Sequence, residues 1–428
     1  MKYTKEDILR IVEEEDVAFI RLQFCDIFGV PKNIAITVSQ LDNALENRCV
    51  FDSASVEGFV KSDESDLYLH PDIDSFDIYP WRPQSGKVAR MFCNVYTADG
   101  RPFSADPRNV LRQVVKRAVD MGINFKVNPE PEFFLFDYDD NGQPTTCTKE
   151  RGGYFDVAPA DQGENVRRDI ILNLEEMGFK ISSSHHEAAP AQHEISFCAE
   201  DAEHMADMIM TFRMAAKTIA KKHGLYATFL PKPTEGISGS GMHISVMAED
   251  DAGNDLFSAG DKGAISDTAR FFIGGILEHV KGMTLVTNPL VNSYKRLVPG
   301  FDAPVNISWS SSSSNRSALI RIPSDKSQGT GVEIRNPDAT CNPYLAIALI
   351  IAAGLDGIDK KLVPTDTQGD NLPMTLGEAI SAFEQDAFVK SVLGEDIFNG
   401  FLDTKKREWK DFRTCVTQWE IGRYLSLF

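Results

Sequence analysis

The chain has 428 residues, 42% of them hydrophobic, and a formal net charge of −19. This length predicts two or three domains with a sizeable core. The negative charge would repel nucleic-acid phosphates and attract small cations, which argues against direct nucleic-acid binding as the main function. Seven cysteines occur without a Cys-x-x-Cys pair, which predicts reduced thiols in a cytoplasmic protein.

The first 105 residues predict a small α+β domain. Residues 4–15 have the pattern of a charged amphipathic helix capped by Thr4, which differs from a signal peptide. A second, short helix is predicted to be capped by Ser39. Strand patterns occur at residues 18–27, 31–38, 65–71 and 87–97. We predict a domain boundary after residue 105.

Residues 106–428 predict a second, larger domain. Asp106 and Pro107 are typical of a helix start, and Gly122 of its end. Strand patterns follow at residues 125–139, 180–187, 192–198, 225–232, 241–248, 304–310, 317–323 and 331–337. Their hairpin-like spacing favours an α+β fold with a mostly antiparallel, curved sheet flanked by helices. The apolar run from Tyr344 is too short to span a membrane and predicts a buried helix.

Four glutamates are placed in pairs. Glu130 and Glu132 share one face of a predicted strand, where two like charges repel unless a cation lies beside them. Glu187 and Glu194 flank a predicted turn at Pro190, so a hairpin would bring them together. Taken alone, the Glu130 and Glu132 pair is equally compatible with a solvent-facing strand start. Together the two pairs point to a cation site.

Two further strands extend this pattern. Glu333 shares a strand face with Arg335, and His243 shares one with Ser245. Five carboxylates and one imidazole suit Mg²⁺ or Mn²⁺, with more than one ion in the site. A metal-free structural protein is the alternative, but it leaves the Glu130 and Glu132 pair unexplained.

Four arginines lie in the same half of the chain. Their planar guanidinium groups bind carboxylates and phosphates in bidentate fashion, although an isolated arginine more often forms a surface ion pair. They are Arg296, Arg316, Arg321 and Arg335. An acidic metal cluster with several arginines predicts an anionic substrate and phosphate transfer.

At this point the chain resembles a known family. The motifs NPEPEFFLF, GGYFD, SHHEAAPAQHEI, GSGMH, NSYKRLVPG, NRSALIRIP and VEIRNPDATCNPYLA occur in the order seen in type I glutamine synthetase. The resemblance covers nearly the whole chain and is closest to the short subtype without adenylylation control. It implies an N-terminal β-grasp domain over 1–105 and a catalytic domain over 106–428. It also implies a dodecamer of two stacked hexamers with active sites between subunits.

The resemblance further implies a role for each matching position. The ligands of a first metal ion match Glu132, Glu187 and Glu194. The ligands of a second match Glu130, His243 and Glu333. Glutamate-binding positions match Gly239, Arg296 and Arg335. Positions around ATP and its transferred phosphate match Ser245, Arg316 and Arg321. The ammonium pocket matches Asp52, Ser55 and Tyr154, with Asp52 as a base. The family's mobile flap residue matches Asp302.

The implied reaction makes glutamine from glutamate, ammonium and ATP through γ-glutamyl phosphate. Several positions depart from the family, however: Asp302 stands for Glu, Ser238 for Asn, Gly331 for Arg, and Ser182 for Glu. Two other hypotheses therefore remain open. The chain could be a γ-glutamyl ligase that uses another amine. It could also be a weakly active homologue with a regulatory role, since some short type I members bind nitrogen-control transcription factors.

Overall fold

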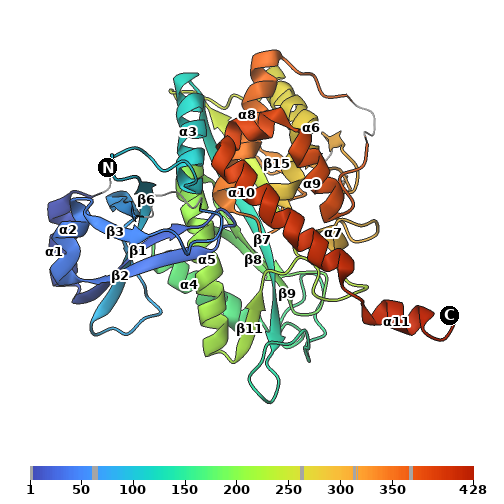
Figure 1. Ribbon diagram of the computed structural model, residues 1–428, viewed down its shortest axis with the longest axis horizontal. Coiled ribbons are helices and arrows are strands. Elements are labelled where there is room, and N and C mark those ends of the chain that lie inside the picture. Colours follow the sequence, from blue (N-terminus) through green and yellow to red (C-terminus); the bar gives the residue numbers. More distant parts are fainter. Residues whose placement is uncertain (1–2, 60–65, 261–264, 312–314, 316, 366–369) are drawn as a thin grey trace.

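The computed structural model describes residues 3–59, 66–260, 265–311, 315, 317–365 and 370–428. Figure 1 shows the N-terminal part as a blue lobe beside a larger body built from the rest of the chain. This arrangement is the expected α+β class, with each part containing a sheet of its own.

The N-terminal lobe is a sheet with two short helices. Its helices and strands are α1 (Lys5–Glu14), β1 (Val17–Cys25), β2 (Pro31–Thr37), α2 (Leu41–Leu45), β3 (Cys49–Asp52), β4 (Asp66–Pro71), β5 (Asp77–Ile78) and β6 (Lys87–Tyr96). Among the described residues the order is β2-β1-β6-β4-β3, with β5 also pairing β6, and β1 runs parallel to β6.

The two predicted helix caps in this lobe had different outcomes. Thr4 caps α1 as predicted, and it does so in a capping box with Asp7. The prediction for Ser39 is wrong, because this residue lies inside a 3₁₀ turn over Val38–Gln40 and no side chain caps α2. The turn continues directly into α2, so no extended residue is left at Ser39 to act as a cap.

The larger sheet carries most of the predicted site residues. Its strands are β7 (Asn124–Asp137), β8 (Ile181–His186), β9 (Gln192–Phe197), β10 (Glu200–Asp201), β11 (Leu225–Thr228), β12 (Met242–Glu249), β13 (Trp309–Ser310), β14 (Ile320–Arg321) and β15 (Val332–Ile334). The described order is β13-β14-β15-β12-β7-β9-β8, with β10 and β11 also on β7. Every pair except β13 with β14 is antiparallel, which confirms the prediction.

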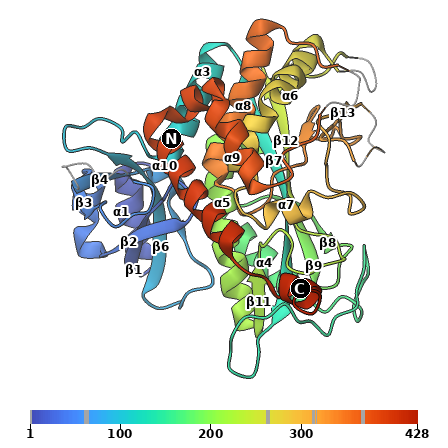
Figure 2. The same ribbon diagram turned by 45° about the vertical axis from the view of Figure 1, so that its right-hand side comes forward.

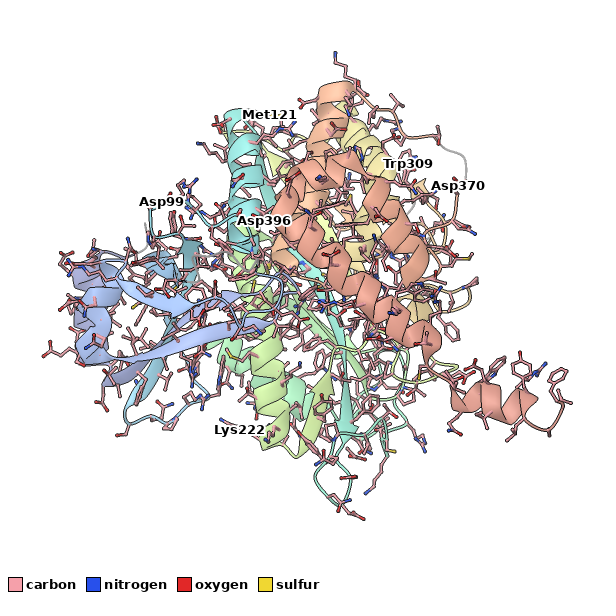
Figure 3. The ribbon with its side chains drawn as sticks, viewed as in Figure 1. Asp99, Met121, Lys222, Trp309, Asp370 and Asp396 are labelled. Carbon is pink, nitrogen blue, oxygen red and sulfur yellow. The ribbon has the colours of Figure 1, made fainter. Side chains whose placement is uncertain are left out.

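The strands predicted at 304–310 and 317–323 are much shorter than expected. Only two residues of each, β13 and β14, join the sheet. The amide of Ile307 donates instead to the carbonyl of Asp370 at 2.8 Å, and that of Leu372 donates to Val305 at 2.8 Å. Figure 3 shows Trp309 and Asp370 on the same side of the molecule. In the first of these two strands, a distant segment therefore takes backbone groups that the prediction assigned to the sheet.

The helices of the larger body are α3 (Pro107–Asp120), α4 (Glu164–Glu176), α5 (Ala202–Lys222), α6 (Asp267–Thr287), α7 (Ser293–Arg296), α8 (Pro343–Lys360), α9 (Leu376–Gln385), α10 (Ala387–Thr414) and α11 (Gln418–Tyr424). Figures 1 and 2 show α3, α6, α8, α9 and α10 gathered together, while α11 projects away from the body. Helix α8 is buried along most of its length, as predicted. Within the described chain, no helix combines the length and apolarity needed to cross a membrane.

A buried arginine joins the two lobes. Asp106 caps α3 as predicted, and its carboxylate also accepts from the amide of Val95 in β6 at 2.9 Å. Arg108, in the first turn of α3, forms ion pairs with Asp72 at 2.7 Å and Asp207 at 2.8 Å. Because Asp72 belongs to the N-terminal lobe and Asp207 to α5, this network fixes the larger sheet relative to the lobe. Ser104 also donates to Asp396 of α10 (Figure 3).

Candidate active site

A cavity of about 460 Å³ lies at the larger sheet and is lined mostly by polar side chains. Of the predicted site residues, the lining contains Glu130, Glu132, Tyr154, Glu187, Glu194, Gly239, His243, Arg296, Asp302, Arg321 and Arg335. Residues that are up to about two hundred positions apart in sequence therefore meet in one place. The sheet brings them together because β7, β9, β12 and β15 are neighbours.

The first group of possible metal ligands joins three strands. His243 on β12 lies opposite Glu130 on β7, and Glu333 lies on the other neighbour, β15. The Nδ1 atom of His243 is 3.3 Å from a carboxylate oxygen of Glu333 and 3.8 Å from one of Glu130. One donor atom from each residue lies within 4.8 Å of the others. One cation could therefore contact all three side chains.

The second group lies at the β8–β9 hairpin. Donor atoms of His185, Glu187 and Glu194 lie within 4.8 Å of one another. Glu132 on β7 is directly opposite Glu194 on β9. One oxygen of Glu132 accepts from the side chain of Gln192 at 2.7 Å. The predicted turn thus brings Glu187 and Glu194 together, with His185 at the edge of the group.

The electrostatics of these groups favour a bound cation. Burial raises the pKa of Glu194 well above its ordinary value, and three neighbouring glutamates raise it further. Burial also raises the pKa values of Glu130 and Glu132, against the opposing effect of nearby arginines. Burial lowers the pKa of His243 well below its ordinary value, so its imidazole is neutral and can bind a metal ion. The donor set fits Mg²⁺ or Mn²⁺.

These shifts predict a pH-dependent effect of the metal. Because the folded-state pKa of Glu194 lies above its ordinary 4.5, the metal-free protein loses stability as pH rises through the folded-state value. A divalent cation bound at Glu194 would release that proton, so its binding would strengthen by up to about 1.4 kcal/mol per pH unit for each proton released. We expect the rise in melting temperature caused by Mn²⁺ to be larger at about pH 8 than at about pH 6.

The control for this prediction is Glu194→Gln, which cannot release a proton at this position. Its stabilisation by Mn²⁺ should depend less on pH. Differential scanning calorimetry, with and without Mn²⁺, provides the measurement. An equal stabilisation of the original chain at both pH values would contradict the prediction.

The arginines lie on the other side of the first group. Arg321 holds Glu333 in a bidentate pair, with Nε to Oε2 at 2.5 Å and Nη2 to Oε1 at 2.9 Å. Arg335 lies 3.5 Å from the same carboxylate and donates to the carbonyl of Asp302 at 3.0 Å. Arg335 therefore connects the predicted flap to the metal-ligand group. These positive charges could stabilise an anionic substrate.

Arg296 is held more tightly than a surface arginine. Its guanidinium group donates to the carbonyls of Asn336, Pro337 and Arg335 at 2.8, 3.2 and 3.0 Å. A side chain at Gly241 would meet this guanidinium group at 2.3 Å, and one at Gly239 would meet the carbonyl of Pro231 at 2.2 Å. Both glycines therefore allow the loop before β12 to pack closely beside the cavity.

Five predicted residues are not part of this cavity lining as the structure describes it. Glu333 is fully buried and contacts two residues of the lining without lining the cavity itself. Asp52 and Ser55 belong to the N-terminal lobe, and no described residue of that lobe lines the cavity. Ser245 is buried on β12 opposite Glu333 and lies outside the lining. Arg316 lies outside the described residues. The geometry of a single chain thus gathers the metal-ligand positions but leaves the predicted ammonium pocket incomplete.

Three departures from the family pattern can be placed. Ser238 lines the cavity. Ser182 donates to the carbonyl of Phe197 in β9 at 3.3 Å. A side chain at Gly331 would meet Met247 and Ser245 only at ordinary contact distances of 3.6 and 3.7 Å, so packing does not require glycine there.

Sequence reasoning missed two polar residues of the site. Gln192 is fully buried and donates to Glu132 at 2.7 Å and to the carbonyl of Gly239 at 3.1 Å. Ser196 donates to Glu194 at 2.7 Å. Each lies two positions from Glu194, one before it and one after it, and so shares its face of β9. The alternation of side chains along a strand could therefore have identified both.

Together, the fold and the cavity are typical of an enzyme site that binds divalent cations and an anionic substrate. Residues 16–98 match the family described as "Glutamine synthetase, beta-Grasp domain", and residues 104–424 match "Glutamine synthetase, catalytic domain". The chain belongs to the glutamine synthetase family and is an enzyme.

Relatives and solved structures agree with this assignment. The chain is 50% identical to glutamine synthetase of Clostridium saccharobutylicum over the full length of both chains. It is 48% identical to glutamine synthetase of Staphylococcus aureus, over 100% of this chain and 99% of that one. A structure entitled "GmaS/ADP complex-Conformation 1" has a TM-score of 0.89 at 30% identity, over 98% of this chain and 99% of that one. Plasmodium falciparum glutamine synthetase shares the fold, with a TM-score of 0.89 at 22% identity over 99% of each chain.

Proposed function

We propose that the cavity is the active site of an ATP-dependent glutamate–ammonia ligase. A γ-carboxylate oxygen of L-glutamate attacks the terminal phosphorus of ATP and releases ADP. Ammonia then attacks the acyl carbon of γ-glutamyl phosphate, loses a proton, and releases phosphate with the electrons of the broken C–O bond. The observation that carries this proposal is the meeting of two groups of metal-ligand side chains with three arginines in one cavity.

The metal-ligand groups have separate roles in this proposal. We assign one Mg²⁺ or Mn²⁺ to Glu132, Glu187 and Glu194, and another to Glu130, His243 and Glu333. When bound, these cations would offset the negative charge of the phosphates. The carboxylates of Glu130, Glu132 and Glu194 support this assignment, because burial raises the pKa of each and a bound cation would favour its charged form.

The remaining roles follow the positions around the cavity. We assign glutamate binding to Gly239, Arg296 and Arg335, and ATP and phosphate contacts to Ser245, Arg316 and Arg321. The carboxylate of Asp302 would shield the acyl phosphate. Its position in the cavity lining, with its carbonyl held by Arg335, supports that assignment. Tyr154 also lines the cavity and would contact ammonium.

Asp52 and Ser55 would complete the ammonium pocket from a neighbouring subunit. The family is oligomeric, and we propose the dodecamer of two stacked hexamers for this chain. The projecting C-terminal segment supports such an assembly, because its large apolar side chains are highly exposed in a single chain. Their exposed fractions are 66% for Trp419, 73% for Leu425 and 102% for Phe428.

Two finer assignments belong to the same proposal. The seven cysteines are all free thiols, which supports a cytoplasmic location. Nitrogen-control transcription factors remain candidate partners by resemblance.

A ligase for another amine is the second candidate function, because Asp302 is one methylene shorter than the family's glutamate and lines the cavity.

We expect ADP release to require glutamate and Mg²⁺ or Mn²⁺ and to be stimulated by ammonium. The amine reacts only in the second step, when it attacks γ-glutamyl phosphate. A panel of primary amines at equal concentration therefore tests directly which amine the enzyme uses. The measurement is kcat/KM for each amine, with glutamate omitted as the control. If ammonium fails while a primary amine stimulates release, the second candidate replaces the first. If no amine stimulates ADP release, the result favours a weakly active homologue with a regulatory role.

A further inference from the structure

A buried side-chain cluster lies behind the β8–β9 hairpin, outside the cavity lining. Glu150, Asp161, His186 and His193 are each at most 4% exposed, and their donor atoms lie within 4.8 Å of one another. Such a set could suggest a further metal site. Arg167, however, pairs with Asp161 at 2.7 Å and with Nδ1 of His193 at 2.8 Å. Because Arg167 already occupies a carboxylate oxygen of Asp161 and a ring nitrogen of His193, the cluster has a different role.

Glu150 contacts both ends of the turn that joins β8 to β9. Its Oε1 accepts from Nε2 of His186 at 2.6 Å and from the amide of Ala191 at 2.5 Å. The Nδ1 atom of His186 in turn contacts the carbonyl of Glu187 at 2.6 Å. The other carboxylate oxygen of Glu150 accepts from the amide of Gln162 at 2.8 Å. One carboxylate thus holds the entry and the exit of the turn.

This turn needs support from outside. Ala191 has a φ of +63°, a left-handed conformation that is unfavourable for a residue with a Cβ atom. Such a conformation persists where surrounding contacts determine it, and the bond from the Ala191 amide to Glu150 is a contact of this kind. Burial alone would raise the pKa of Glu150, but hydrogen bonds from His186 and two backbone amides outweigh it and lower the pKa to about 2. The carboxylate is therefore charged at neutral pH.

The segment that carries Glu150 is shaped to reach the hairpin. A side chain at Gly152 would meet Nε2 of His186 at 2.7 Å, and one at Gly163 would meet Nε2 of His193 at 2.4 Å. The amide of Phe155 also donates to the carbonyl of His186 at 3.1 Å. Glycine at these positions lets the connection between β7 and α4 pack directly against the two imidazole rings.

We propose that Glu150, acting through His186 and the amide of Ala191, is a positioning residue that fixes Glu187 and Glu194 for one of the two metal ions. This inference rests on the proposed metal sites of the ligase. Substituting a residue that orients a metal ligand commonly lowers the metal affinity by about ten- to a hundred-fold. The hydrogen bonds of the Glu150 carboxylate go to His186, Ala191 and Gln162, so the other group, formed by Glu130, His243 and Glu333, should be unaffected.

The test is Mn²⁺ binding to the metal-stripped full-length chain, followed by electron paramagnetic resonance of free Mn²⁺. Glu150→Gln retains the side chain's size but cannot accept hydrogen bonds at both of its terminal atoms. We expect one Mn²⁺ affinity to fall by about ten-fold or more, and the other to change by less than about two-fold. Glu150→Asp retains the charge and should recover part of the loss.

The matched control is Glu203→Gln, the same substitution at a different site. Glu203 of α5 forms an ion pair with Arg108 of α3 at 2.9 Å. The substitution should leave both Mn²⁺ affinities unchanged. Folded Glu150→Gln and Glu150→Asp variants that retain both affinities would overturn the inference, as would an equal loss at both sites. If Glu150→Gln does not fold, the two Mn²⁺ affinities of Glu150→Asp decide, and no change in either overturns the inference. An original chain that binds no Mn²⁺ would overturn the proposed function as well, so the two failures can be distinguished.

Discussion

Replacing Glu333 by glutamine is expected to lower kcat for ADP formation by about a hundred-fold or more. Glu333 is fully buried, lies 3.3 Å from His243, and forms a bidentate pair with Arg321. The amide has the same size but would remove one anionic ligand from the proposed metal site. It also removes the charge that pairs with the partly buried Arg321, which is unfavourable. ADP release with glutamate and ammonium gives the rate.

Glu249→Gln provides a matched control for this variant. Glu249 lies on β12, in the same sheet, and pairs with Lys126 at 2.9 Å, away from the cavity lining. A loss of that partly exposed ion pair should change the rate by less than about two-fold. Circular dichroism shows whether both variants fold. If folded Glu333→Gln enzyme turns over at the original rate, Glu333 is not part of the metal site.

Two inactive variants are expected to restore activity when they assemble together. Asp52 ends β3 in the N-terminal lobe, and no described residue of that lobe lines the cavity of its own chain. If the site joins the lobe of one subunit to the larger body of the next, Asp52→Asn and Glu333→Gln damage opposite halves. In a random one-to-one mixture, about a quarter of the sites then combine two intact halves.

The measurement is ADP release from oligomers that contain both variants, purified through two different tags after co-expression. The control pairs Glu333→Gln with Glu132→Gln, because both changes lie in the larger body and no combination yields an intact site. Simple mixing of the two assembled variants should also remain inactive. If the co-assembled Asp52 and Glu333 variants recover nothing, the site does not lie between subunits in the way we propose.

Local patterns along the chain were sufficient for several features. The capping residues Thr4 and Asp106 were predictable, because a cap is decided by the three or four residues around it. The shared face of Glu130 and Glu132 followed from the two-residue period of a strand, and both line the cavity. The ordered motifs identified the family from the residues themselves. The separation of Glu187 and Glu194 by a turn was likewise a local property.

Contacts between distant segments decided the rest. Nothing around Arg321 predicts that its guanidinium group pairs with Glu333, because this depends on β14 and β15 being neighbours. The shortening of the strand predicted at 304–310 depended on residues 370–372, which bond to the backbone of Val305 and Ile307.

The sequence by itself thus determined the types of ligand and the strand faces on which they lie. These properties arise from neighbouring residues and the geometry of the backbone. The tertiary structure alone showed that Glu150 holds a turn whose residues lie about forty positions further along the chain. It also showed that Asp52 lies outside its own chain's cavity lining. Such contacts depend on which segments meet after folding, and no local pattern records that choice.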